Sequence, residues 1–188
     1  MYKLPLYIVA LLWVLASCMV CIPLYSQPSN LGNPPVVNYP KNQTLAGTQT
    51  WAIEEDPFGY TWFANNQGVL KFDGYRWEVL RIANKTIVRS LACDKKEHKV
   101  YVGGQGEFGY FSPDERGVFR YTSLSAALDK EHQGFGDVWH TIVTAQGVFF
   151  RTDHQVFRYA GQEPHPLFRE EKSFNFIAQW GRETVLQD

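Results

Sequence analysis

Cysteine and excess charge are both scarce in this sequence. Beyond residue 21 the chain holds a single cysteine, Cys93, within the apolar run Leu91-Ala92-Cys93. One cysteine forms no intramolecular disulfide, and this apolar setting predicts a buried small side chain rather than a reactive thiol. Lysine and arginine number 18 against 19 aspartate and glutamate residues, which gives a net charge of −1. This balance argues against nucleic acid or an anionic membrane surface as a partner.

Patterns typical of metal, cofactor and catalytic sites are also lacking. No two of the five histidines have helical i, i+4 spacing or the spacing of a zinc site. The acidic run Glu54-Glu55-Asp56 lacks the alternating ligands of a calcium loop, and we expect it to be a solvated turn. Gly104–Gly109 matches G-x-G-x-x-G, but a strand and a turn follow instead of the required helix. We therefore expect these glycines to serve a turn or bulge, and we expect no metal, cofactor or catalytic residue.

Long apolar runs are confined to the N-terminus. Residues 4–24 are almost unbroken apolar sequence after Lys3, which is typical of a targeting segment. The first interpretation is a signal peptide over residues 1–26, cleaved after Ser26. The alternatives are a lipoprotein signal, in which Leu15-Ala16-Ser17-Cys18 places a lipid on Cys18, and an uncleaved membrane anchor. All three interpretations send the rest of the chain out of the cytoplasm, to a periplasmic location.

Aromatic residues, by contrast, are abundant at 15% of the chain, and they follow a repeat. Residues 51–80 read as four short strands separated by Gly and Asn/Asp turns, which is one antiparallel propeller blade if the unit recurs. It does recur, because the second-strand aromatic precedes the third-strand aromatic by ten residues in three successive copies. These pairs are Trp62 and Phe72, Tyr101 and Phe111, and Phe149 and Tyr159.

The sequence therefore predicts an all-β fold made of four-stranded antiparallel blades. We expect an extended lead-in at 27–50, in which Thr44–Thr50 could add an outer strand, and a partial propeller at 51–188. The predicted blades cover about 51–80, 88–124, 138–161 and 173–188. A short helical turn is expected at Ser125–Leu128, in an insertion after the second blade. Three complete blades and the start of a fourth leave the ring incomplete.

Four residues at equivalent places in the four copies form the candidate ligand-binding site. Trp51, Arg89 and His140 each stand two residues before an aliphatic first-strand residue, and Asn175 has this place in the fourth copy. The first strand of a blade lies nearest the central channel. A purely structural position would favour aliphatic residues, and arginine is rarely buried without a partner. Because residues i and i+2 share one face of a strand, packing between blades is the alternative placement.

Several segments give the chain a specific resemblance. They are NPPVVNYPKNQTLAGTQTWAI, ANNQGVLKFDGYRW, VRSLACD, YVGGQGEFGYF and DVWHTIVTAQGVFF. In these segments the chain resembles the N-terminal sensor of bacterial two-component-regulator propeller proteins, which carry a triple-tyrosine motif. The resemblance covers essentially everything past about residue 33. It implies an exported propeller followed by a β-sandwich, a membrane helix and a cytoplasmic output such as a histidine kinase.

These observations favour a non-catalytic, ligand-binding sensor segment of a signal-transduction protein. Trp51 could stack on a carbohydrate, while Arg89 could bind an anionic group and His140 could donate or accept a hydrogen bond. The expected partners are a small extracellular ligand and the downstream domains of the same protein, with a homodimer of the full-length protein as a further expectation. The alternatives are a propeller hydrolase or lyase acting on glycans, and a protein-interaction scaffold.

Overall fold

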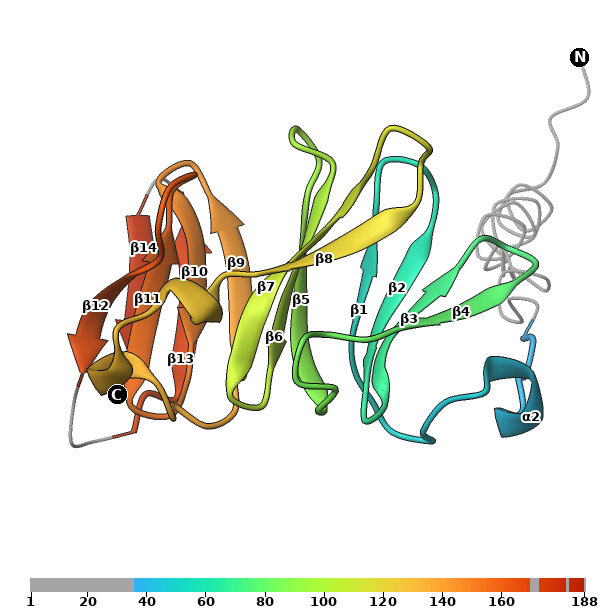
Figure 1. Cartoon of the computed structure of the whole chain (residues 1–188), viewed down its shortest axis with the longest axis horizontal. Helices are drawn as coiled ribbons and strands as arrows, with labels where there is room; N and C mark the ends of the chain where they lie inside the picture. Colours follow the sequence, from blue (N-terminus) through green and yellow to red (C-terminus); the bar gives the residue numbers. More distant parts are fainter. Residues whose placement is uncertain (1–35, 170–172, 182, 188) are drawn as a thin grey trace, which may run out of the picture. The chain divides into compact units, whose positions relative to one another are not determined.

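The computed structural model describes residues 36–169, 173–181 and 183–187 of the chain (Figure 1). The chain divides into two compact units, Met1–Asn38 and Tyr39–Asp188. In the first unit only residues 36–38 are described, and they belong to no helix or strand. The predicted signal peptide or anchor thus lies outside the described residues. Within the described ranges, no helix is both long enough and apolar enough to cross a membrane.

The second unit consists of antiparallel sheets, each made from consecutive strands (Figure 1). The first sheet comprises β1 (Thr50–Glu55), β2 (Thr61–Asn65), β3 (Gly68–Phe72) and β4 (Trp77–Leu80). The second comprises β5 (Val88–Asp94), β6 (Lys99–Gly104), β7 (Glu107–Pro113) and β8 (Phe119–Ser123). The third comprises β9 (His140–Thr144), β10 (Gly147–Arg151), β11 (Gln155–Tyr159) and β12 (His165–Arg169), and the fourth β13 (Phe176–Trp180) and β14 (Glu183–Gln187). The predicted fold class is confirmed: these are meander blades, and the described sheets close no ring.

The third blade is longer than the sequence predicted. Its fourth strand, β12, runs to Arg169, whereas the predicted blade ended at residue 161. Pro164 precedes β12 and Pro166 lies within it, and the segment has no apolar alternation, which hides the strand from pattern analysis. Pro166 is tolerated because β12 is the last strand of its sheet and its pairing with β11 is irregular, with a register shift between Val156 and Phe157.

The lead-in also differs from its predicted extended form. It contains a short helix, α2 (Lys41–Thr44), and residues 45–49 belong to no strand, so the extra outer strand does not form. Asn65 fastens the lead-in to the first sheet, since its Oδ1 accepts the Gly47 N–H at 3.0 Å and its Nδ2 donates to the Gly47 carbonyl at 2.8 Å. In the insertion after the second blade, the helical turn predicted at Ser125–Leu128 is present as the 3₁₀ helix η1 (Ser125–Ala127), and a second 3₁₀ helix that was not predicted, η2 (Lys130–His132), follows it.

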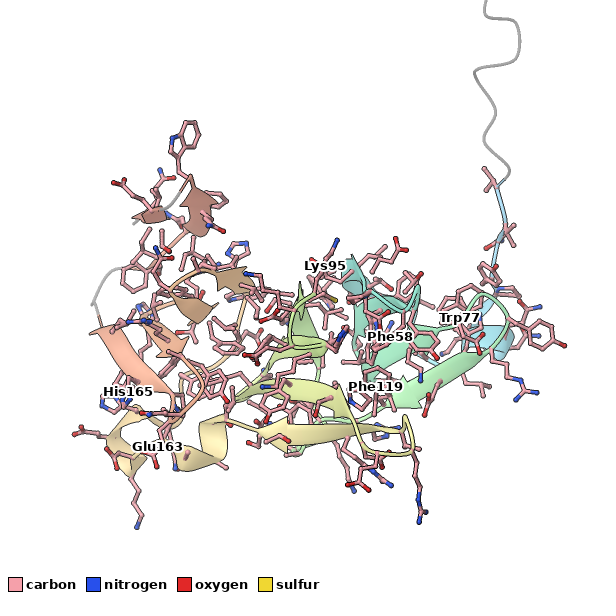
Figure 2. All side chains as sticks on the ribbon, turned by 90° about the horizontal axis from the view of Figure 1, so that it is seen from above. Phe58, Trp77, Lys95, Phe119, Glu163 and His165 are labelled. Atoms are coloured by element: carbon pink, nitrogen blue, oxygen red, sulfur yellow. The ribbon has the colours of Figure 1, made fainter. Side chains whose placement is uncertain are left out.

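The first strands of the sheets are the inner strands of the unit. β1 packs beside β5, β5 beside β9, and β9 beside β13. The fourth strands of the three complete sheets lie at the opposite sheet edges. Figure 2 shows Trp77 of β4, Phe119 of β8 and His165 of β12 well apart from one another. The first strands are therefore the ones that lie side by side from one sheet to the next.

Aromatic side chains fill the layers between neighbouring sheets. The second-strand aromatics Trp62, Tyr101 and Phe149 are all buried. The Trp62 ring lies 4.8 Å from that of Phe119 in the next sheet, and the Tyr101 ring lies 6.2 Å from that of Phe150. Each layer buries one side of a sheet against its successor, which a single four-stranded meander could not achieve by itself.

The predicted solvated turn at Glu54-Glu55-Asp56 is wrong for Asp56, which is buried. Its Oδ1 accepts the N–H groups of Phe58 and Tyr60 at 2.9 and 3.0 Å, and its Oδ2 accepts the Trp62 Nε1–H at 2.8 Å. The carboxylate thus shapes the turn and also satisfies the indole donor of a fully buried tryptophan.

Two other sequence interpretations hold in the structure. Gln105 and Gly106 form the turn between β6 and β7, and Gly106 has φ of 64°, which favours glycine. The G-x-G-x-x-G pattern therefore serves a hairpin. Cys93 is partly buried against the core between the first two sheets, and burial, followed by the nearby carboxylates Glu54 and Asp56, raises the pKa of its thiol to about 12.

Candidate ligand-binding site

Two of the predicted site residues occupy β-bulges. The pairing of β1 with β2 shifts between Thr50 and Ala52, so that Trp51 is left outside the ladder. The pairing of β5 with β6 shifts in the same way between Val88 and Ser90, at Arg89. A bulge leaves its extra residue unpaired and redirects the side chain. The first two inner strands thus present Trp51 and Arg89 at equivalent places.

The equivalent residue in the third sheet is Trp139 and not the predicted His140. The sheets can be aligned on the second-strand residue that stands two positions after the buried aromatic. In each complete sheet this residue pairs with one residue of the first strand: Ala64 pairs with Ala52, Gly103 with Ser90, and Arg151 with His140. The residue before His140 is Trp139, whose N–H donates to the Arg151 carbonyl at 2.9 Å. The residue equivalent to Trp139 in the fourth sheet is Asn175. Its N–H donates to the Gln187 carbonyl, and the next residue, Phe176, pairs with Gln187, just as His140 pairs with Arg151.

Arg89 lies between the two tryptophans. Its Cζ is 4.1 Å from the ring centroid of Trp51 and 4.9 Å from that of Trp139. The two indole rings meet edge to face, with centroids 6.3 Å apart and an interplanar angle of 72°. Both distances from the guanidinium are within the range of cation–π attraction. We call these three residues, together with Asp137, the inner cluster.

The positive charge of Arg89 is already paired. Its Nε and Nη2 both donate to Asp137 Oδ2, each at 3.1 Å, and the two side chains are 12% and 13% exposed. Asp137 Oδ1 is shielded from solvent and accepts no hydrogen bond from any described residue. The inner cluster is therefore close to neutral, and an incoming anion would have to compete with the Asp137 carboxylate.

Trp51 gives the inner cluster its accessible surface. Its side chain is 40% exposed, although the indole Nε1–H donates to Asn66 Oδ1 at 2.7 Å. Asn66 is held in turn, because its Nδ2 donates to Gln49 Oε1 at 3.0 Å. A tryptophan ring fixed at one edge and open to solvent is a stacking platform that loses little conformational entropy when a ligand binds.

His140 and Asn175 belong to other surroundings. His140 Nδ1 accepts hydrogen bonds from Arg151 Nε at 3.2 Å and from Arg151 Nη2 at 3.0 Å. Burial, and secondarily the Arg151 charge, lowers the pKa of His140. Asn175 is exposed at the start of the fourth sheet. Of the four predicted residues, the structure therefore places Trp51 and Arg89 in direct contact and leaves these two outside the inner cluster.

Sequence reasoning missed Trp139 and Asp137. The third sheet has no bulge in its first strand, so counting back from Ile142 is one residue out of register with the other sheets. The signal that could have found Trp139 was a second tryptophan beside His140, matching Trp51 in type. Asp137 lies before β9 and reaches Arg89 across 48 residues of sequence, which no local pattern reveals.

Besides a hollow of about 400 Å³ at the turn between β7 and β8, two hollows lie elsewhere in the part of the second unit that the structure describes. One, of about 380 Å³, is lined by residues of the second and third sheets, including Asp94, Glu97 and Arg158. The other, of about 320 Å³, lies between the lead-in and the first sheet and is lined by Tyr39 and Trp77 among others. No member of the inner cluster lines either hollow. Among the described residues, no group of three or more His, Cys, Asp or Glu side chains is arranged to hold a metal ion.

Comparisons with known proteins do not identify the family of the chain. No protein-family model matches the sequence, and no curated protein matches it significantly.

Proposed function

We propose that this chain is the ligand-binding part of an exported sensor, the N-terminal portion of a propeller protein of the two-component-regulator type. In this proposal residues 1–26 direct export to the periplasm, and downstream domains hold the full-length protein in the membrane. A small extracellular ligand binds at the inner cluster, and its occupancy passes to an output domain that carries any catalytic activity. Support comes from the sequence motifs, the meander blades and the position of the inner cluster, whose members lie on the first strands β1 and β5 or directly before β9.

The observation that carries the proposal is the pair of tryptophans around Arg89. A half-exposed indole face suits the apolar face of a sugar ring, and the neighbouring polar groups can receive or donate hydrogen bonds to hydroxyl groups. An uncharged carbohydrate fits the inner cluster better than an anion does, because Asp137 already neutralises Arg89.

Binding can be tested by titrating the full chain in a calorimeter with neutral oligosaccharides and, separately, with their uronic acid counterparts. We expect a neutral ligand to bind, and we expect Trp51→Ala to weaken its binding by about tenfold or more, which corresponds to about 1.4 kcal/mol. Trp180→Ala is the matched control, because Trp180 is 80% exposed on β13 and lies outside the inner cluster. Equal weakening by the two variants, or binding of uronic acids alone, would contradict the proposed site.

The sensor role can be tested on the gene. We expect the reading frame that encodes this chain to continue into a membrane helix and an intracellular output domain. A stop codon directly after the last blade would instead favour a secreted hydrolase or a scaffold. This outcome is independent of the calorimetry, so the signalling role and the ligand site can fail separately.

A further inference from the structure

A buried arginine in the third sheet has no carboxylate partner among the residues that the structure describes. Arg151, on β10, is 5% exposed. Its Nε and Nη2 donate to His140 Nδ1, and its Nη1 donates to the carbonyls of Thr152 and Phe174. All of these acceptors are uncharged. Buried arginines are rarely found without a paired charge, so this arrangement depends on each neutral acceptor keeping its lone pair available.

These contacts join the third sheet to the start of the fourth. Phe174 is buried, and its N–H donates to the Asp153 carbonyl at 2.7 Å, directly before the strand β13. The Phe176 ring on β13 lies 6.0 Å from the His140 ring, edge to face. Arg151 therefore holds β9, β10 and the segment that enters β13 in one hydrogen-bonded unit, which we call the Arg151 brace.

The Arg151 brace requires His140 to be neutral. Its Nδ1 accepts two N–H groups, so the ring carries its proton on Nε2. A proton on Nδ1 would remove the acceptor and place two cations about 3 Å apart. Burial lowers the pKa of Arg151, and the charge of Asp153, on the turn after β10, acts in the opposite direction. The other charged residues on strands packed against β9 have their own contacts: Arg89 is paired with Asp137, Lys99 is paired with Glu97, and Asp94 accepts the N–H groups of its own turn.

We propose that the Arg151 brace is an acid-sensitive latch: protonation of His140 breaks both hydrogen bonds from Arg151 and loosens the β13–β14 hairpin, while the first two sheets stay folded. The inference goes beyond the proposed function, because it makes the boundary between the third and fourth sheets respond to external acidity. Burial and the Arg151 charge support it by lowering the pKa of His140. A histidine whose pKa is lowered on folding stabilises the fold fully above its unfolded value of about 6.5, and this stabilisation is lost as the pH falls towards the folded value.

Hydrogen exchange on the full chain tests the latch. The protection of the β13 amides would be compared with that of the β2 amides from about pH 7.5 to about pH 5, after correction for intrinsic exchange. We expect the opening constant of β13 to rise by up to about tenfold for each pH unit below about 6.5, with β2 unchanged. A β13 protection that does not change relative to β2 would overturn the proposal.

Two substitutions separate the latch from general acid effects. In His140→Asn, the amide Oδ1 can take the place of Nδ1 and cannot be protonated, so we expect β13 protection to become independent of pH. His98→Asn is the control, because His98 lies on the β5–β6 turn with φ of 54°, a conformation that asparagine tolerates. It should keep the native pH response. An identical pH response in His140→Asn and in the native chain would overturn the latch.

A spectroscopic readout covers the case in which His140→Asn does not fold. Nitrogen-15 shifts of the His140 ring in the native chain should show an unprotonated Nδ1 at neutral pH. Because the pKa of His140 is lowered in the folded chain, Nδ1 should gain its proton at the acid end of the pH range over which β13 loses protection. A protonated Nδ1 at neutral pH would by itself refute the latch.

Discussion

Removing Arg89 should destabilise the chain strongly, because the Asp137 carboxylate would then lie largely buried without a partner. Breaking one partner of a buried ion pair typically costs about 3–5 kcal/mol, and a lost cation–π contact adds about 0.5–2 kcal/mol. The two side chains keep 12% and 13% exposure, which lets some water reach the unpaired carboxylate. We therefore expect Arg89→Ala to lower the free energy of unfolding by about 3 kcal/mol, towards the lower end of this range.

A double-mutant cycle isolates the pair. Arg89→Leu and Asp137→Leu should each destabilise the full chain, and the double variant should be more stable than the sum of the two changes predicts, with a coupling of about 2 kcal/mol. Urea unfolding followed by tryptophan fluorescence gives the values, provided that the m-value stays constant. Glu78→Ala is the control. It breaks the pair of Lys71 with a carboxylate side chain that is 51% exposed, and it should cost less than about 1 kcal/mol.

The cycle also decides how Arg89 takes part in the site. If Arg89→Ala leaves the free energy of unfolding within about 0.5 kcal/mol of the native value, the guanidinium is exposed to water and its contact with Asp137 does not stabilise the packing of the sheets. A neutral ligand would then no longer be favoured over an anion, because this preference depends on the pairing of Arg89 with Asp137. A coupling close to zero would lead to the same conclusion.

Three further predictions concern the core, the thiol and export. Trp62→Ala should cost about 3–5 kcal/mol in the same urea assay, because the ring is fully buried between the first two sheets. Cys93 should resist alkylation by iodoacetamide at about pH 8 in the folded chain and react in denaturant, since burial raises its thiol pKa to about 12. A reporter active only outside the cytoplasm, fused after Tyr121, should be active. It should lose activity when Leu11 and Leu12 are both changed to arginine, which costs about 2.5–3.5 kcal/mol for each charge inserted.

Most of the fold could be predicted because hairpin geometry fixes the spacing of side chains. In each of the three complete sheets, the second and third strands pair in the same register about a tight turn, so that aromatics ten residues apart recur at equivalent places. Burial of Trp62, Tyr101 and Phe149 then follows from their shared place. β12 escaped prediction because an outer strand that tolerates proline needs neither alternation nor aromatic residues.

The candidate site could be predicted only in part because bulges break the register that the repeat otherwise keeps. Two of the first strands carry a bulge and the third does not, so a constant count from the aliphatic positions finds Trp51 and Arg89 but gives His140 in place of Trp139. The partner of Arg89 depends on the packing of β5 beside β9. Such contacts between sheets do not follow the period of the repeat, so the sequence pattern does not reveal them.

The most direct test of ligand binding at the inner cluster is to follow the tryptophan indole signals of the full chain by NMR during titration with a neutral oligosaccharide. Each signal would be assigned by single substitution. The proposed site predicts that the Trp51 and Trp139 indoles shift with ligand concentration, while those of Trp62, Trp77 and Trp180 stay in place. Shifts confined to the latter three, with Trp51 and Trp139 unchanged at saturation, would contradict it.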